Sequence, residues 1–221
     1  MFRSTIALFL LAIPLAAQSG KIPPGFTRIF NGKNLDGWHI SQVTHHGNSK
    51  DWTVKDGVLS GGQEPYGNGG LLVTDKTYKN YEIYMEIKPD WGCDGGLFLR
   101  SNEMGQSYQV QINYLPNDYV GGISGEGLGP NDTTIKMSPA PDWQKVWKKD
   151  DWNSLRARIE GDVPHLTIWI NGTKVNDWTD TANHLIGGAV DGKIALQVHG
   201  GKGRWAEGAH HRFRNIAIKE L

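Results

Sequence analysis

The sequence predicts an all-β protein, a two-sheet antiparallel jelly-roll sandwich, and three observations lead to this prediction. Short segments that alternate polar and apolar residues recur along the chain, and no amphipathic helix of three turns interrupts them. Asp56-Gly57 and Asn171-Gly172 separate paired segments, as expected for the type I′ turns of two-residue hairpins. Connections rich in Gly, Asn and Pro divide the rest, notably 61–70 and 121–141. No repeat of about 20–50 residues is visible, which argues against a propeller or a solenoid.

The expected strands follow one another in chain order. A hairpin over 51–60 comes first and turns at Asp56-Gly57. The segment 81–88 then alternates with period two and ends at Pro89, a residue that disfavours a central strand. The later strands are expected at 96–101, 108–114, 152–160, 166–171, 174–178, 193–199 and 212–219.

Composition limits the function classes. The chain has 221 residues, with 23 Lys+Arg against 23 Asp+Glu, so its formal net charge is zero. This balance gives no electrostatic reason to bind nucleic acid or an anionic membrane. The length suffices for one domain with a sizeable core, which we place at 21–221. The only cysteine, Cys93, has no intramolecular partner and lies in a Gly-rich segment, where we expect an incidental thiol rather than a nucleophile.

Residues 1–20 are typical of a secretory signal peptide. Arg3 precedes an apolar run over 6–17, and small residues follow, with cleavage expected after Ala17. The run is shorter than the roughly 20 apolar residues of a transmembrane helix. We therefore expect an exported protein, periplasmic or extracellular, with no membrane attachment once the signal is removed.

Polar side chains occupy one face of three expected strands, at 96–101, 108–114 and 193–199. Residues two apart on a strand share a face, and here each strand pairs an apolar face with a polar one. A solvated outer face normally carries Lys, Glu and Thr, whereas amides, Arg and His suit fixed hydrogen bonds to hydroxyls and carbonyls. The sequence therefore favours a functional face formed by Arg100, Gln109, Gln111, Asn113, Gln197 and His199.

The nine tryptophans point to carbohydrate as the partner. Aromatic rings offer flat apolar surfaces to the C–H faces of sugars, while amides and Arg hydrogen-bond the hydroxyls. Most of these side chains are expected in the core. Trp52 and Trp205 are the two that we expect to be exposed and to bind substrate.

Several familiar chemistries are absent from the sequence. It has no phosphate-binding loop followed by Lys and Ser/Thr, no Gly-x-Ser-x-Gly elbow and no His/Cys cluster with zinc spacing. His45 and His46 are adjacent, so on a strand they would point to opposite faces and make a weak metal site. Glu82 and Glu86 share a face but lie roughly 13 Å apart along a strand. That is too far for the pair of a retaining glycosidase, whose carboxyls are about 5–5.5 Å apart.

Motifs along the chain resemble those of a known family. They are 26–38 (FTRIFNGKNLDGW), 52–59 (WTVKDGVL), 95–100 (GGLFLR), 108–112 (YQVQI), 196–200 (LQVHG) and 213–216 (FRNI). Their order and spacing resemble the 3-keto-disaccharide hydrolase domain family over about 25–221. The resemblance implies a concanavalin A-like jelly roll that acts on glycosides already oxidised at C3. Two positions depart from the family pattern: Gln109 stands where Glu is common, and Asn113 where an acidic residue is common.

The chemistry of such a substrate assigns roles to the polar residues. A ketone at C3 acidifies the C2 proton, so a base can remove it, the enolate expels the C1 substituent, and water adds back. Histidine is the side chain that most readily exchanges a proton near neutral pH, so His199 is the candidate base, and Arg100 is a fixed cation for the enolate. Glu126, in a Gly-rich loop, is the candidate acid. Asp94 is a second candidate or a substrate-binding group.

Three alternatives remain open at this point. The first is a 3-keto glycoside hydrolase or lyase, the second a carbohydrate-binding module without turnover, and the third a structural surface domain. No cofactor is expected with confidence. A divalent cation such as Ca²⁺ stays an open alternative, with Asp94 as its candidate ligand.

Overall fold

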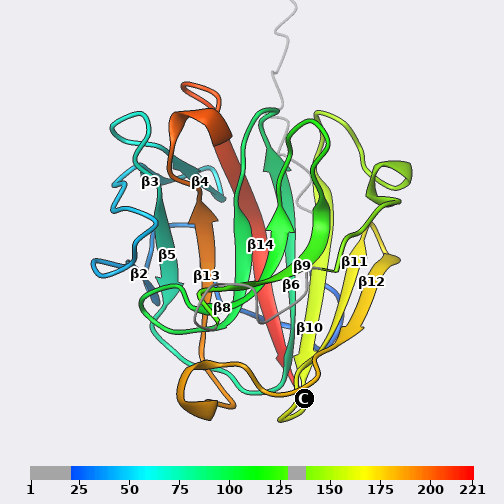
Figure 1. Cartoon of the computed structure of the whole chain (residues 1–221). Helices are drawn as coiled ribbons and strands as arrows, with labels where there is room; N and C mark the ends of the chain where they lie inside the picture. Colours follow the sequence, from blue (N-terminus) through cyan, green and yellow to red (C-terminus); the bar gives the residue numbers. More distant parts are fainter. Residues whose placement is uncertain (1–20, 129–137) are drawn as a thin grey trace, which may run out of the picture.

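The computed structural model describes residues 21–128 and 138–221, and it confirms the predicted two-sheet antiparallel sandwich (Figure 1). One sheet has eight strands, in the order β12 (Thr173–Thr179), β11 (His165–Ile170), β10 (Asn153–Glu160), β6 (Tyr81–Pro89), β14 (His210–Glu220), β4 (Val58–Gly62) and β3 (Trp52–Lys55), with β1 (Thr27–Arg28) paired to β14. The other has six, in the order β2 (Trp38–Ile40), β5 (Gly70–Thr74), β13 (Lys193–Val198), β7 (Gly96–Ser101), β8 (Ser107–Ile112) and β9 (Val120–Glu126). Three short 3₁₀ segments complete the described elements: η1 (Trp143–Lys145), η2 (Ile186–Gly188) and η3 (Lys202–Arg204).

The two hairpin turns form as predicted. Asp56 and Gly57 have φ angles of 50° and 80°, and Asn171 and Gly172 have 50° and 83°. Positive φ at both central residues defines the type I′ turn, and Asn, Asp and Gly adopt it most readily. Each turn joins strands in direct register, Lys55 with Val58 and Ile170 with Thr173.

The expectation that 121–141 is a connection was wrong for its first residues, because β9 extends from Val120 to Glu126. Glycines at 121 and 122 suggested a loop, but they have a packing reason. A Cβ on Gly122 would collide with the Gln111 side-chain amide of the neighbouring β8. Likewise β5 begins at Gly70, so the other expected connection, 61–70, already includes the first residue of a strand. In these strands, glycine occurs where a neighbouring residue comes so close that it leaves no room for a side chain.

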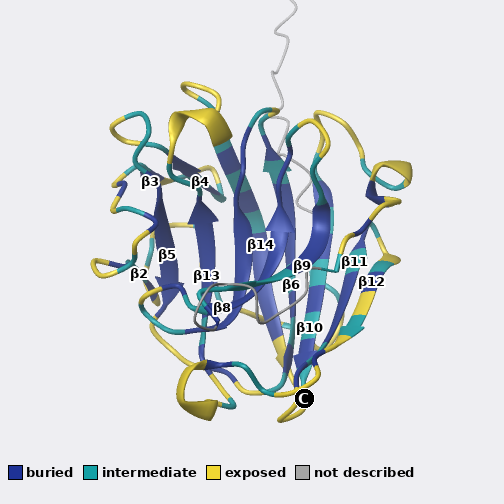
Figure 2. Cartoon of the chain, viewed as in Figure 1, coloured by how far each residue is buried: buried dark blue, intermediate teal, exposed yellow. Residues whose placement is uncertain are grey.

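The two sheets differ in how far their strands are buried (Figure 2). The outer face of the eight-stranded sheet carries charged and partly exposed residues, such as the pair Arg156 and Glu82 at 3.8 Å. In the six-stranded sheet, every residue of β7 and β8 is buried. A small apolar cluster of Leu71, Val73, Phe98 and Ala195 lies apart from the main core, and the His46 ring stands edge-on to Phe98 at 5.4 Å. Loop residues such as His46 therefore cover part of this outer face. A polar face that loops shield from solvent can form a binding site.

His211, on β14, makes the fold sensitive to acid. The side chain is buried, and burial lowers its pKa to about 3. Between pH 6.5 and 3 the unfolded chain binds a proton there that the folded chain does not, so the free energy of unfolding falls as pH drops. The slope for one such group approaches about 1.4 kcal/mol per pH unit. Urea unfolding at pH 7, 6 and 5 should show this slope, and His211→Gln should reduce it. An unchanged slope in His211→Gln, with His165→Gln as the control, would contradict this account.

The expected signal peptide, with its cleavage after Ala17, lies outside the described residues, so export stays a prediction. In the ranges 21–128 and 138–221, no helix combines the length and the hydropathy that a membrane span requires.

Candidate functional site

A cleft of about 410 Å³ opens over the outer face of the six-stranded sheet. Its side chains come from four places: the loop between β2 and β3, the loop between β4 and β5, the end of β9, and the residue after β13. Glycines form much of the wall, and a Cβ on Gly69 would strike the backbone of 198–200. The residues with side chains that line the cleft are His45, His46, Asn68, Glu126 and His199.

His199 follows β13 and is held with one ring nitrogen free for proton transfer. Its Nδ1 lies 2.5 Å from the carbonyl oxygen of Gly200, so Nδ1 carries the proton and donates it. The neutral ring then has its lone pair on Nε2, which lies 3.8 Å from Oδ2 of Asp94. The side chain is 38 % exposed, so a ligand in the cleft can reach it. This is the arrangement that a general base requires, with a carboxylate placed to stabilise the imidazolium.

Asp94 is buried beside His199 and is paired with Arg204. The Nε–H of Arg204 donates to Oδ2 of Asp94, and its Nη2 donates to Oδ2 of Asp118 at 2.8 Å. Burial raises the pKa of Asp94, while His199 and Arg204 oppose that rise. The pair with Arg204 uses the carboxylate that was one open candidate as a ligand for a cation such as Ca²⁺. Asp94 is thus placed to position and stabilise His199 rather than to hold a metal.

A hydrogen-bonded chain of amides leads to His46, which lines the cleft. Ser124 Oγ donates to Gln109 Oε1, Gln109 Nε2 donates to Gln197 Oε1, and Gln197 Nε2 donates to His46 Nδ1, each at 3.1 Å. Burial lowers the pKa of His46 to about 3, so the ring is neutral and its proton resides on Nε2. Gln109 and Gln197 therefore do come together on one face, but their amide groups bind each other and fix the His46 ring.

The other two polar residues of β8 and its continuation lie farther along the same face. Asn113 Nδ2 donates to Oδ1 of Asp118 at 3.0 Å, which links it to the Arg204 network. Gln111 is buried beside Gly122 of β9. Neither residue lines the cleft itself.

His45, His46 and Glu126 form a group that could hold a metal ion. Their ligand atoms all lie within 4.8 Å of one another, and Glu126 Oε1 is 3.3 Å from His45 Nε2 and 3.6 Å from His46 Nε2. The prediction that adjacent histidines point apart was wrong. Both residues lie in a turn rather than a strand, and their ring centroids are 4.0 Å apart. Two imidazoles and a carboxylate suit a transition-metal ion better than Ca²⁺, which prefers oxygen ligands.

Comparison with known proteins shows the family of the chain. The sequence model of the 3-keto-alpha-glucoside-1,2-lyase-like domain matches residues 25–219. The chain belongs to this family. The match confirms the resemblance seen in the sequence motifs. A 3-keto-disaccharide hydrolase of Bacteroides thetaiotaomicron is 33 % identical over 243 aligned positions, covering 89 % of this chain and 79 % of the relative.

Solved structures share the fold of this 3-keto-alpha-glucoside-1,2-lyase-like domain. A protein of Parabacteroides distasonis assigned as a glycosyl hydrolase matches with a TM-score of 0.59 and 22 % identity, over 89 % of this chain and 94 % of that one. The carbohydrate-binding module CBM66 of Bacillus subtilis matches with a TM-score of 0.55 and 16 % identity, over 83 % and 96 %. A beta-1,3-glucanase of Mycobacterium marinum matches with 0.54 and 11 %, over 85 % and 91 %. At these identities the likeness confirms the jelly-roll fold.

The structure removes Arg100 from the site of this lyase-like domain. Arg100 has a φ of 52°, and the pairing of β7 with β13 shifts register beside it, so a bulge interrupts the alternation that placed Arg100 on the face of Phe98. The guanidinium is buried and donates to Lys79 O at 2.7 Å, Gly161 O at 2.9 Å and Asn80 Oδ1 at 2.8 Å.

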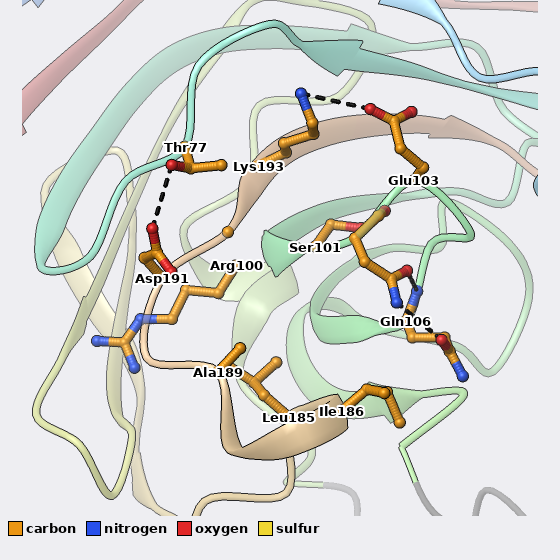
Figure 3. Close-up of a pocket in the computed structure, with 12 residues that line it drawn as sticks. Thr77, Arg100, Ser101, Glu103, Gln106, Leu185, Ile186, Ala189, Asp191 and Lys193 are labelled. Carbon is orange, nitrogen blue, oxygen red and sulfur yellow. Dashed lines mark hydrogen bonds and ion pairs between the residues drawn. The ribbon is translucent and has the colours of Figure 1, made fainter.

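Arg100 belongs instead to a separate pocket of about 290 Å³ at the opposite end of β13 from His199 (Figure 3). In that view its guanidinium points away from Glu103 and Gln106. The role of enolate cation, expected for Arg100, therefore has no geometric basis in the cleft.

Trp52 and Trp205 were also expected to be exposed, and this was wrong. They are 6 % and 2 % exposed. The Trp52 ring packs over Gly61, where a Cβ would collide with it. Trp205 lies against the His211 ring at 4.9 Å, and its Nε1 donates to Ala209 O at 3.0 Å. Gly61 makes room for the Trp52 ring, and His211 packs against the Trp205 ring. These contacts are long-range, so the sequence around each tryptophan does not reveal them.

Cys93 is buried, and burial raises the pKa of its thiol to about 12. A thiol that stays protonated at neutral pH is a poor nucleophile, which agrees with the expectation of an incidental cysteine. Sequence reasoning missed Arg204 entirely, because it lies in the short η3 segment with no strand pattern to indicate its direction.

Proposed function

We propose that this chain is a glycoside-cleaving enzyme that acts on 3-keto glycosides at the cleft, with His199 as the base. Membership of the family and the 3-keto-disaccharide hydrolase relative support this substrate class. The observation that carries the proposal is the state of His199, whose Nε2 lone pair is available in the cleft beside a buried carboxylate.

The proposed reaction proceeds by elimination and hydration. His199 Nε2 takes the C2 proton, which the C3 ketone acidifies, and the electron pair of the C2–H bond forms the enolate. The enolate then re-forms the ketone, makes a C1–C2 double bond and expels the C1 oxygen substituent, which takes up a proton. Water adds at C1 and a proton returns to C2, so the net reaction is hydrolysis. Asp94, 3.8 Å from Nε2, stabilises the imidazolium that carries the proton.

Glu126 is the proposed acid for the leaving oxygen. It lines the cleft from the end of β9, opposite the contribution of β13, and its side chain is 24 % exposed. The group of His45, His46 and Glu126 offers an alternative to this role. If it held a divalent cation, the cation would supply Lewis-acid stabilisation of the enolate in place of Arg100, and Glu126 would be an ionised ligand and not the acid.

The direct test supplies purified protein with a 3-keto disaccharide and, separately, with the unoxidised parent disaccharide. We expect release of monosaccharide from the 3-keto substrate only, because only that substrate has an acidic C2 proton. Cleavage of both at equal rates would contradict the proposal. Binding without cleavage of either would instead support the alternative, a carbohydrate-binding module without turnover.

The hydrogen bonds from Gln109 through Gln197 to His46 predict the effect of Gln109→Glu. A carboxylate at 109 can only accept, so it should bind Gln197 Nε2 and turn the Gln197 oxygen toward His46. The His46 proton then moves to Nδ1, and Nε2 presents a lone pair toward Glu126. We expect tighter binding of Zn²⁺ or Mn²⁺ in isothermal titration, by about tenfold or more. Gln109→Ala is the control, and equal cation affinity in Gln109→Glu and wild type would refute the prediction.

We also propose that the protein is exported and that its signal peptide is removed by cleavage after Ala17. The support is the basic residue, short apolar run and small residues of that segment. Mass spectrometry of protein recovered from cells should find a mature N-terminus close to Gln18. Recovery of the full-length chain from the cytoplasm would overturn this proposal.

A further inference from the structure

We propose that an aromatic pocket at one end of the sandwich is a second carbohydrate-binding site, which holds a neutral glycan beside the cleft. The aromatic pocket is a cavity of about 570 Å³, within the range of small-molecule sites. The four aromatic residues that line it are Trp91, Tyr114, Trp143 and Trp147. None of them lines the cleft.

The rings of the aromatic pocket hold one another in place. Tyr114 is central, with its ring centroid 4.8 Å from that of Trp91, 6.1 Å from Trp143 and 5.3 Å from Trp147. Tyr114 and Trp143 are 4 % and 3 % exposed, whereas Trp91 is 52 % exposed and stands perpendicular to Tyr114 at 89°. A large aromatic side chain held half in water above a cavity is a surface that a ligand can cover.

The rim of the aromatic pocket indicates the class of ligand. Asn117, Gln144, Lys149 and Asp150 supply both hydrogen-bond donors and acceptors around the rings. The one lysine and the one aspartate have opposite charges, which favours a neutral ligand over an anion or a cation. A pyranose has apolar C–H faces for the rings and a circle of hydroxyls for the rim, whereas a lipid chain would leave these polar groups unpaired.

A chain of hydrogen bonds connects the aromatic pocket to the cleft. Trp143 Nε1 donates to Asp118 O at 3.2 Å, and the Asp118 carboxylate accepts from Arg204, which also binds Asp94 beside His199. Trp91 and Asp94 lie on the same loop, between β6 and β7. The aromatic pocket and the cleft are therefore linked by one hydrogen-bonded network. The binding itself does not depend on the proposed function, since it would occur even if the cleft were inert.

The test measures binding of three neutral probes, cellohexaose, laminarihexaose and maltohexaose, by calorimetry and tryptophan fluorescence. We expect wild type to bind at least one probe and Trp91→Ala to bind it at least about tenfold more weakly, as for a tryptophan at the centre of a binding surface. Trp169→Ala is the matched control, because Trp169 stacks under Arg156 at 4.0 Å on the other sheet and should leave binding unchanged. His199→Ala should bind as wild type does.

Three results would overturn the proposal: no binding of any probe, binding that Trp91→Ala leaves unchanged, or binding that His199→Ala abolishes. The last would place the glycan in the cleft. Circular dichroism of Trp91→Ala should match wild type, since the side chain is half exposed, and Trp91→Phe should recover part of the affinity if ring stacking is the cause. Glycan binding that depends on Trp91, in a protein that does not cleave 3-keto substrates, would refute the proposed function and leave this inference standing.

Discussion

His199→Ala should lower kcat on a 3-keto disaccharide by about 10²–10⁴-fold, the usual contribution of a positioned general base. The side chain is partly exposed, and it contacts the Gly200 carbonyl and Asp94. Its removal should therefore change the free energy of unfolding by about 1 kcal/mol or less. Steady-state kinetics and urea unfolding of the same preparation measure the two effects.

A matched control is available for this variant. His165 is also 38 % exposed and also lies near a carboxylate, at 2.6 Å from Asp177, but it is on β11 of the other sheet. His165→Ala should leave kcat unchanged. Equal losses in the two variants would mean that a general effect of removing a surface histidine, rather than loss of the base, lowers the rate.

Arg100→Met should have the opposite profile, a large loss of stability with turnover retained in the folded protein. The substitution keeps the apolar stem but removes three donors, to Lys79 O, Gly161 O and Asn80 Oδ1. Buried or partly buried acceptors left without donors cost about 1–3 kcal/mol each, and water can reach these three in part, so we expect a total of about 2–4 kcal/mol. Urea unfolding measures the loss.

Arg100→Lys separates geometry from charge. A lysine keeps the positive charge but cannot form the forked set of hydrogen bonds, so it should recover little stability. A fall in kcat of a hundredfold or more in Arg100→Met, with stability unchanged, would instead return Arg100 to the reaction and contradict the position found for it.

Regular strands explain why part of the site could be predicted from the sequence. Gln109, Gln197 and His199 occupy positions where alternation holds, so their common face was correctly predicted from spacing alone. The hairpins at Asp56-Gly57 and Asn171-Gly172 were likewise predicted, because those dipeptides have a strong local preference for positive φ.

The other site residues could not be placed from the sequence, because their positions depend on departures from regular strand structure. One bulge with a positive φ at Arg100 reversed the side of the sheet on which that side chain lies. His45 and His46 converge because a turn, not a strand, contains them. Trp52 is buried because a glycine on the neighbouring β4 makes room for its ring, and that pairing is a long-range property of the fold.

The most direct test of the central claim is turnover of a 3-keto disaccharide in D₂O, followed by mass spectrometry and NMR of the released 3-keto monosaccharide. The account predicts cleavage with deuterium at C2 of the product, because His199 removes the C2 proton and a solvent-derived proton replaces it. The uncatalysed substrate and His199→Ala, incubated alike, give the background exchange. Cleavage that leaves protium at C2, or no cleavage at all, would contradict the account.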